Sequence, residues 1–78
     1  MPLTPDQVTE MLALPYVGKT VIQRLQEVGL DDVAVLADSD STEVLELIAT
    51  HLRSSCWKNS PQAKQSIANI IAWAKQYP

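Results

Sequence analysis

Apolar side chains along this chain recur every three or four residues, which is the spacing of amphipathic helices, and no stretch alternates as a strand does. The spacing predicts helices over residues 5–13, 19–28, a brief segment within 30–37, 41–52 and 61–76. Residues 53–60 are mostly polar and predict a loop. We therefore expect an all-α fold of about five short helices that forms one domain over residues 1–78.

Local signals at the predicted helix ends support these boundaries. Thr4 and Gln7, on either side of Pro5, match a capping box, in which two side chains bond backbone amides at the start of a helix. Ser60 is placed to cap the last helix. Gly29 is placed to end the second helix in the left-handed conformation that glycine adopts without strain.

Aliphatic residues must supply most of the core, because the chain has two Trp, two Tyr and no Phe. We expect the buried side chains to include Leu25, Leu36, Ile48 and Ile70. In the fourth predicted helix, Leu47 is assigned to the same apolar face as Ile48. A core of this size is thin, so we expect modest stability.

Charge is distributed unevenly along the chain. Residues 1–50 hold nine acidic residues and two cations, Lys19 and Arg24, whereas residues 51–78 hold four cations and no acid. Such asymmetry is typical of a nucleic-acid-binding face, and also of two ends that attract each other within the fold or across a dimer. The sequence leaves both explanations open.

The residues that usually carry chemistry are scarce. Cys56 is the single cysteine, which excludes an intrachain disulfide, and His51 is the single histidine, so a zinc site would lack ligands. Neither residue has the partners of a nucleophilic site, so we expect no enzyme activity, no catalytic residue and no metal site. The chain opens with no signal-peptide pattern and has no apolar stretch of about 20 residues, so we expect a cytoplasmic protein that does not enter membranes.

Residues 12–19, with the sequence Leu-Ala-Leu-Pro-Tyr-Val-Gly-Lys, together with Leu25, Gly29 and Leu30, resemble the helix-hairpin-helix DNA-binding family. The resemblance covers residues 8–37, and the remainder is similar to the short stand-alone bacterial members described as pathogenicity-locus proteins. It implies a SAM-like orthogonal bundle whose hairpin grips the DNA backbone without sequence preference. It also implies that hairpin carbonyls sometimes hold a monovalent cation, and no other cofactor is expected.

Tyr16 and Ile22 depart from the family's pattern, which usually has a glycine at the first position and a small residue at the second. Two roles for Tyr16 are open. One is a half-buried lid over the hairpin, and the other is an exposed ring that stacks on an unpaired base. The departures also leave open whether the hairpin contacts DNA or is purely structural.

The hairpin has the chemistry of an anion site in its own right. Gly18 is expected to let the chain turn sharply and approach a ligand closely. The amides of Lys19, Thr20 and Val21 then open a helix, whose N-terminus carries partial positive charge. Lys19 and Thr20 add side-chain donors, and Arg24 lies one turn farther along. The predicted phosphate-binding residues are Tyr16, Val17, Gly18, Lys19, Thr20 and Arg24.

The last two predicted helices and the polar stretch between them outline a second hairpin without glycine. Arg53, Lys58 and Lys64 form its predicted secondary basic face, which would let two hairpins contact two backbone strands. The alternative is a solvated basic loop in which Trp57 anchors the chain to the core.

These features predict a protein that binds DNA weakly and without sequence preference, through backbone phosphates. The alternative is a protein-protein interaction or self-association module with no nucleic-acid affinity, which the opposite charges of the two halves support. We expect a monomer or a weak dimer in either case.

Overall fold

The computed structural model describes residues 3–53 and 56–77, and every regular element within them is a helix. The elements are α1 (Pro5–Leu12), α2 (Lys19–Glu27), α3 (Val33–Ala37), α4 (Ser41–Leu52), α5 (Cys56–Asn59) and α6 (Pro61–Gln76). The all-α prediction is confirmed, and α4 and α6 have the predicted bounds. The first two helices each end one residue earlier than expected, at Leu12 and Glu27.

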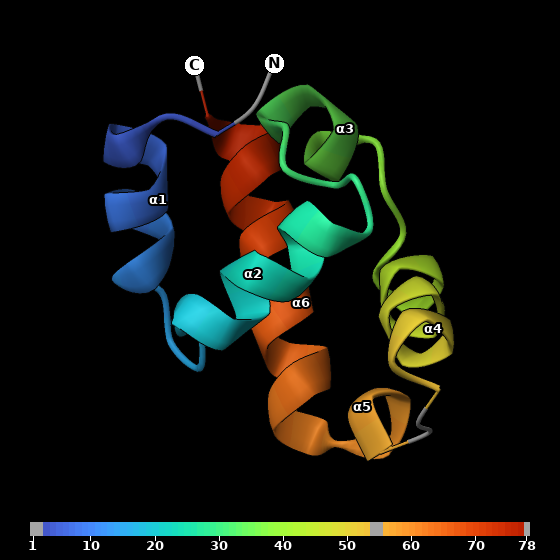
Figure 1. Cartoon of the computed structure of the whole chain (residues 1–78). Coiled ribbons are helices and arrows are strands. Elements are labelled where there is room, and N and C mark those ends of the chain that lie inside the picture. The colour runs from blue at the N-terminus through green and yellow to red at the C-terminus, as the bar shows by residue number, and fades with distance from the viewer. Residues whose placement is uncertain (1–2, 54–55, 78) are drawn as a thin grey trace.

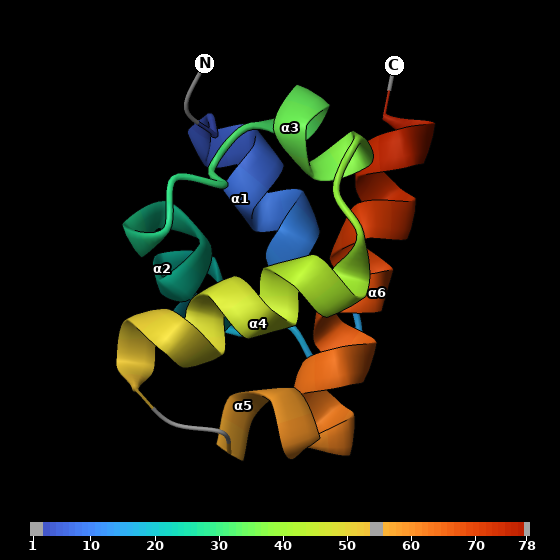
Figure 2. The ribbon, with the colours of Figure 1, turned by 90° about the vertical axis from the view of Figure 1, so that its right-hand side faces the viewer.

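The long helix α6 is the element around which the others are arranged. It contacts α3, α4 and α5, and two views show it running along most of the molecule (Figures 1 and 2). The start of α1, the end of α6 and α3 lie toward one end of the molecule, whereas α5 and the start of α6 lie at the opposite end. The chain between α1 and α2 lies away from the end that holds α3.

The core is aliphatic. Leu25, Leu36, Ile48 and Ile70 are each completely buried, as the sequence predicts. The remaining members of the core cluster are Met11, Val17, Ile22, Val44, Leu45, Ile67, Ile71 and Ala74. Burying a Val, Leu, Ile or Met side chain contributes about 1.5–3 kcal/mol, so the eleven such residues of the cluster form the main stabilising contact between the helices.

Leu47 does not belong to this core, because 49% of its surface is exposed. The expectation that it lies on the inner face of its helix is wrong. Val44 and Ile48 are four residues apart and define the buried face of α4. Leu47 instead shares helical spacing with Glu43 and Thr50, both of which are exposed, and so faces outward with them.

The predicted caps form. The Thr4 amide donates to Oε1 of Gln7 at 2.9 Å, and the Gln7 amide donates to Oγ1 of Thr4 at 3.2 Å, which completes the capping box of α1. Gly29 has φ +78°, and the next amide, of Leu30, donates to the Leu25 carbonyl at 2.8 Å. This bond defines a left-handed helix stop of the Schellman type, as expected after α2.

Residues 56–59 form the one-turn helix α5, so the prediction of a loop is wrong for that stretch. The Ser60 amide closes the turn by donating to the Trp57 carbonyl at 3.3 Å. Trp57 is half-buried and packs against the core, which confirms its predicted role as an anchor. Packing of one large ring therefore shapes a segment whose polar composition alone predicts irregular structure.

Candidate nucleic-acid interface

The candidate site is centred on residues 13–18, here called the first connection, which joins α1 to α2. Its sharp turn occurs at Tyr16, which has φ +65°. Gly18, by contrast, has φ −128° and ψ 179°, an extended conformation that any residue adopts. The expectation that Gly18 makes the turn is therefore wrong, because the left-handed residue is two positions earlier.

Gly18 has no side chain that could cap the start of α2. It is the N-cap residue of α2 and makes no side-chain cap hydrogen bond, and a Cβ placed on it would meet nothing within 4 Å. The other described helices of five or more residues are capped by the side chains of Thr4, Asp32, Asp40 and Ser60. The start of α2 is thus open to an outside hydrogen-bond acceptor, since no described side chain occupies it.

Two of the predicted site residues stand at this open end. Lys19 and Thr20 form the first turn of α2, and both are exposed. Val17 lies just before them but is only 9% exposed and belongs to the core, so its side chain holds the connection in place and does not face a ligand.

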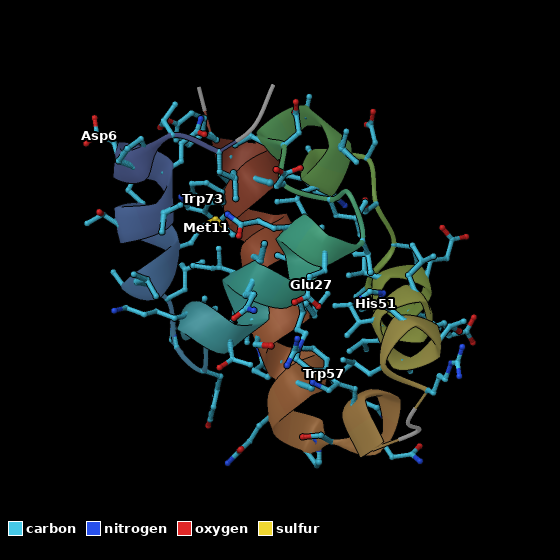
Figure 3. All side chains as sticks on the ribbon, in the orientation of Figure 1. Asp6, Met11, Glu27, His51, Trp57 and Trp73 are labelled. Atoms are coloured by element: carbon cyan, nitrogen blue, oxygen red, sulfur yellow. The ribbon has the colours of Figure 1, made fainter. Side chains whose placement is uncertain are left out.

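Arg24 is engaged elsewhere. Its Nη1 donates to both carboxylate oxygens of Glu27, at 2.9 and 3.0 Å, and its Nε is buried without a hydrogen bond to any described residue. The hydrogen bond from Arg24 is the main reason why the pKa of Glu27 lies below its ordinary value. Nε2 of His51 also lies 3.0 Å from Glu27, so α2 and α4 meet there (Figure 3). Arg24 therefore faces the end of α2, and the structure does not bring it to the open start.

The first connection is tied to α6 by one long-range hydrogen bond. Nδ2 of Asn69 donates to the Pro15 carbonyl at 2.9 Å, across 54 positions of sequence. Nε2 of Gln65 in turn donates to Oδ1 of Asn69 at 2.8 Å. The backbone just before Tyr16 is thereby fixed to the face of α6, which positions the turn.

Lys64 belongs to the predicted secondary basic face and lies on α6 next to Gln65. A surface hollow beside Tyr16 and another beside Lys64 share Pro61 and Gln65 in their walls. Arg53 caps α4 with φ +53° and is exposed, but no described contact joins it to Lys64. The side chain of Lys58 lies outside the described part of the structure.

The charges of the two halves differ in space as well as in sequence. Residues 11–26 and 47–78 contain no Asp or Glu and carry all six cations of the chain. These two segments supply the first connection, the open start of α2 and the whole of α6. Asp32 and Asp38 cap the two ends of α3, which lies at the end of the molecule away from the first connection (Figure 1), and Asp31 precedes them in the sequence. Asp40 caps the start of α4. Glu46 lines the same hollow as Lys64.

Three amide residues in this region, Gln62, Gln65 and Asn69, were not among the predicted site residues. They line the hollow beside Tyr16 together with Pro15 and Pro61. Their spacing of three and four positions places them on one face of α6, and this pattern is visible in the sequence. Their proximity to Tyr16 depends on a tertiary contact, which no local sequence pattern predicts.

Within residues 3–53 and 56–77, no three side chains of His, Cys, Asp or Glu gather into a metal site. No helix of that part combines the length and apolar character needed to span a bilayer. The chain matches no protein-family model, no curated protein and no solved structure. Its function must therefore be inferred from its own residues and their geometry.

Proposed function

We propose that this chain is a non-catalytic helix-hairpin-helix protein that binds the nucleic-acid backbone weakly and without base preference. The contact set consists of Gly18, Lys19 and Thr20 at the start of α2, with Lys64 of α6 in support. The observation that carries the proposal is the uncapped start of α2, which opens on a surface built from the two acid-free segments. The resemblance of residues 8–37 to the family agrees with it.

Phosphate is the ligand that suits this chemistry. The first amides of a helix have no acceptor within the helix, and its N-terminus carries about half a positive charge, so a phosphate oxygen satisfies both. Lys19 adds a full charge and Thr20 a hydroxyl donor. Contacts to phosphates position a protein on its ligand and carry no base information, so binding is sequence-independent.

Affinity is expected to be low because the contact set is small. With about two to four phosphates neutralised, log affinity falls against log salt concentration with a slope of roughly −2 to −4. A fluorescence anisotropy titration of labelled duplex and single-stranded DNA at several low salt concentrations measures both quantities.

The decisive variant is Lys19→Glu, with Lys75→Glu as the matched control. Both substitutions change the net charge equally, but Lys75 lies in the last turn of α6, whose C-terminal end is far from the first connection (Figure 1). Lys19→Glu is expected to weaken binding at least about tenfold, and Lys75→Glu no more than about twofold. Equal losses, or no binding by the unaltered protein at high micromolar concentration, would exclude the proposal.

One observation favours a second function, which is interaction with another protein. Leu47 is exposed, and with Val28 it lines a hollow on α4 that is edged by Glu43 and Glu46. Such a surface suits a partner with apolar and basic side chains. Sedimentation equilibrium at several concentrations separates this function from nucleic-acid binding: a dimer that Leu47→Ser abolishes, in a protein without DNA affinity, would favour it.

A further inference from the structure

We infer that the exposed ring of Tyr16 is a stacking platform for an unpaired base, so that the preferred ligand is single-stranded nucleic acid. This inference rests on the proposed function and deepens it. It concerns the ring and the hollows on either side of it, and it is separate from the contacts of the start of α2.

The exposure of Tyr16 is the first support. Its surface is 62% exposed, which excludes the alternative of a half-buried lid. The other aromatic residues are partly buried: Trp57 and Trp73 pack against the core, and the ring of Tyr77 lies 5.1 Å from that of Trp73. Among the aromatic side chains of the chain, Tyr16 alone presents most of its surface to solvent.

The surroundings of the ring are the second support. Tyr16 lines two adjacent hollows, one with Gln62, Gln65 and Asn69 in its wall, and one that extends toward Val21, Trp57 and Ser66. Side-chain amides offer both donors and acceptors, so they can bond to the edge of any base. A base on the ring would therefore meet neutral polar groups and apolar walls, without an acid among the residues that line either hollow.

The backbone that carries the ring is also held in place. Nδ2 of Asn69 donates to the Pro15 carbonyl, and Tyr16 itself is left-handed, so the fold sets where the side chain of Tyr16 leaves the backbone. Lys19 follows three positions later at the open start of α2. A single nucleotide can thus place its base against the ring and its phosphate toward the helix start.

Base stacking favours single strands for a physical reason. Every base has a flat face, and stacking on an aromatic ring tolerates any sequence. In a duplex those faces are already stacked on neighbouring pairs, and exposing one requires a base to be unpaired or a step to be opened. A phosphate-binding surface without such a ring would not distinguish single strands from a duplex.

The test compares a labelled oligo(dT) with a duplex of the same length in anisotropy titrations of the full chain. The variants are Tyr16→Gly, Tyr16→Phe and, as the aromatic control, Tyr77→Phe. We expect oligo(dT) to bind more tightly than duplex, and Tyr16→Gly to weaken oligo(dT) binding by about 5-fold to about 150-fold, the range for one stacked base. Tyr16→Phe keeps the ring and should bind oligo(dT) within about threefold of the unaltered protein.

Two further measurements make the result decisive. Glycine adopts φ +65° without strain, so Tyr16→Gly is expected to unfold at the same temperature as the unaltered protein or higher, which separates lost stacking from lost structure. In NMR titrations, the ring protons of Tyr16 should shift upfield as oligo(dT) binds, because they enter the shielding region of the base.

The inference is overturned if duplex and oligo(dT) bind equally, or if Tyr16→Gly leaves oligo(dT) binding unchanged. If Lys19→Glu still abolishes binding in that case, the proposed phosphate contact stands and only the stacking role fails. If the unaltered protein binds neither ligand at high micromolar concentration, the stacking role and the proposed function fail together.

Discussion

Two segments of this molecule join helices in similar ways and end differently. The first connection is residues 13–18, and the second connection, residues 53–60, joins α4 to α6 and contains α5. Among the residues that the structure describes, the first holds Tyr16 in the left-handed conformation at φ +65°, and the second holds Arg53 at φ +53°. The first ends at Gly18, which offers no side chain to cap α2. The second ends at Ser60, whose Oγ accepts the Ala63 amide at 3.3 Å.

Under the function we propose, this difference implies that cations alone do not make a phosphate site. The second connection contains Arg53 and Lys58 and is followed by Lys64, but the helix it leads into already has its own acceptor. The first connection is followed by a single adjacent cation, Lys19, but leads into an open helix start. The geometry thus favours the less basic of the two connections as the anion site.

The largest expected effect comes from adding a side chain that caps the open start of α2. Gly18 has the extended backbone of an N-cap residue and empty space beside it, so Gly18→Asp should cap α2 and raise the free energy of unfolding by a few tenths of a kcal/mol. The same carboxylate would occupy the amides that we assign to phosphate. DNA affinity, measured by anisotropy, should fall at least about tenfold while stability does not fall.

The matched control for that substitution is Thr4→Asp, which adds the same charge at the start of α1, where a capping side chain already stands. It should lower DNA affinity clearly less than Gly18→Asp does. If both variants lose affinity equally, binding follows net charge and the open helix start has no special role.

A second prediction concerns the capped helix. Ser60→Ala removes the acceptor for the Ala63 amide and should lower the free energy of unfolding by about 1 kcal/mol. Gly18→Ala, at the uncapped helix, removes no hydrogen bond and meets no neighbour, so its effect should stay within about 0.5 kcal/mol. Urea unfolding of the two variants checks the contrast, and equal losses would show that the Ser60 cap contributes nothing.

A third prediction concerns the left-handed residue found in each connection, Tyr16 in the first and Arg53 in the second. Tyr16→Gly and Arg53→Gly should each raise the free energy of unfolding by about 0.5–1 kcal/mol. The relief of left-handed strain, about 1–2 kcal/mol, exceeds the entropy that glycine adds to the unfolded chain. Gly29→Ala reverses the change at φ +78° and should lower the free energy of unfolding by about 0.5–1 kcal/mol. Urea midpoints that move the same way in all three variants would contradict this account.

Local chemistry allowed much of the fold to be predicted from the sequence. The capping box at Thr4, the stop at Gly29 and the cap at Ser60 each depend on residues within a few positions of one another. The spacing of Ile67 and Ile70 likewise identifies the buried face of α6. Such features need no knowledge of how the helices pack.

The candidate site was less predictable because tertiary contacts shape it. The Asn69 bond to Pro15 spans 54 positions, and the left-handed turn at Tyr16 follows no propensity of tyrosine. The Arg24 and Glu27 pair, at a spacing of three, was within reach of sequence inspection. It removes Arg24 from the proposed phosphate site, although its position on α2 had suggested that it belongs there.

The smallest expected effect is a pH dependence of stability at the contact between Glu27 of α2 and His51 of α4. This contact joins the helix that follows the first connection to the helix that precedes the second. The Glu27 pKa is lowered from 4.5, chiefly by its hydrogen bond from Arg24, with a further contribution from His51. A carboxylate with a lowered pKa stabilises the fold above its ordinary pKa, and this contribution is lost as pH falls through the lowered value. Thermal unfolding between pH 6 and pH 3 should therefore show a smaller acid-induced loss for Glu27→Gln than for the unaltered protein. A Glu27→Gln curve that runs parallel to that of the unaltered protein would mean that the contact between the two helices does not depend on the carboxylate charge.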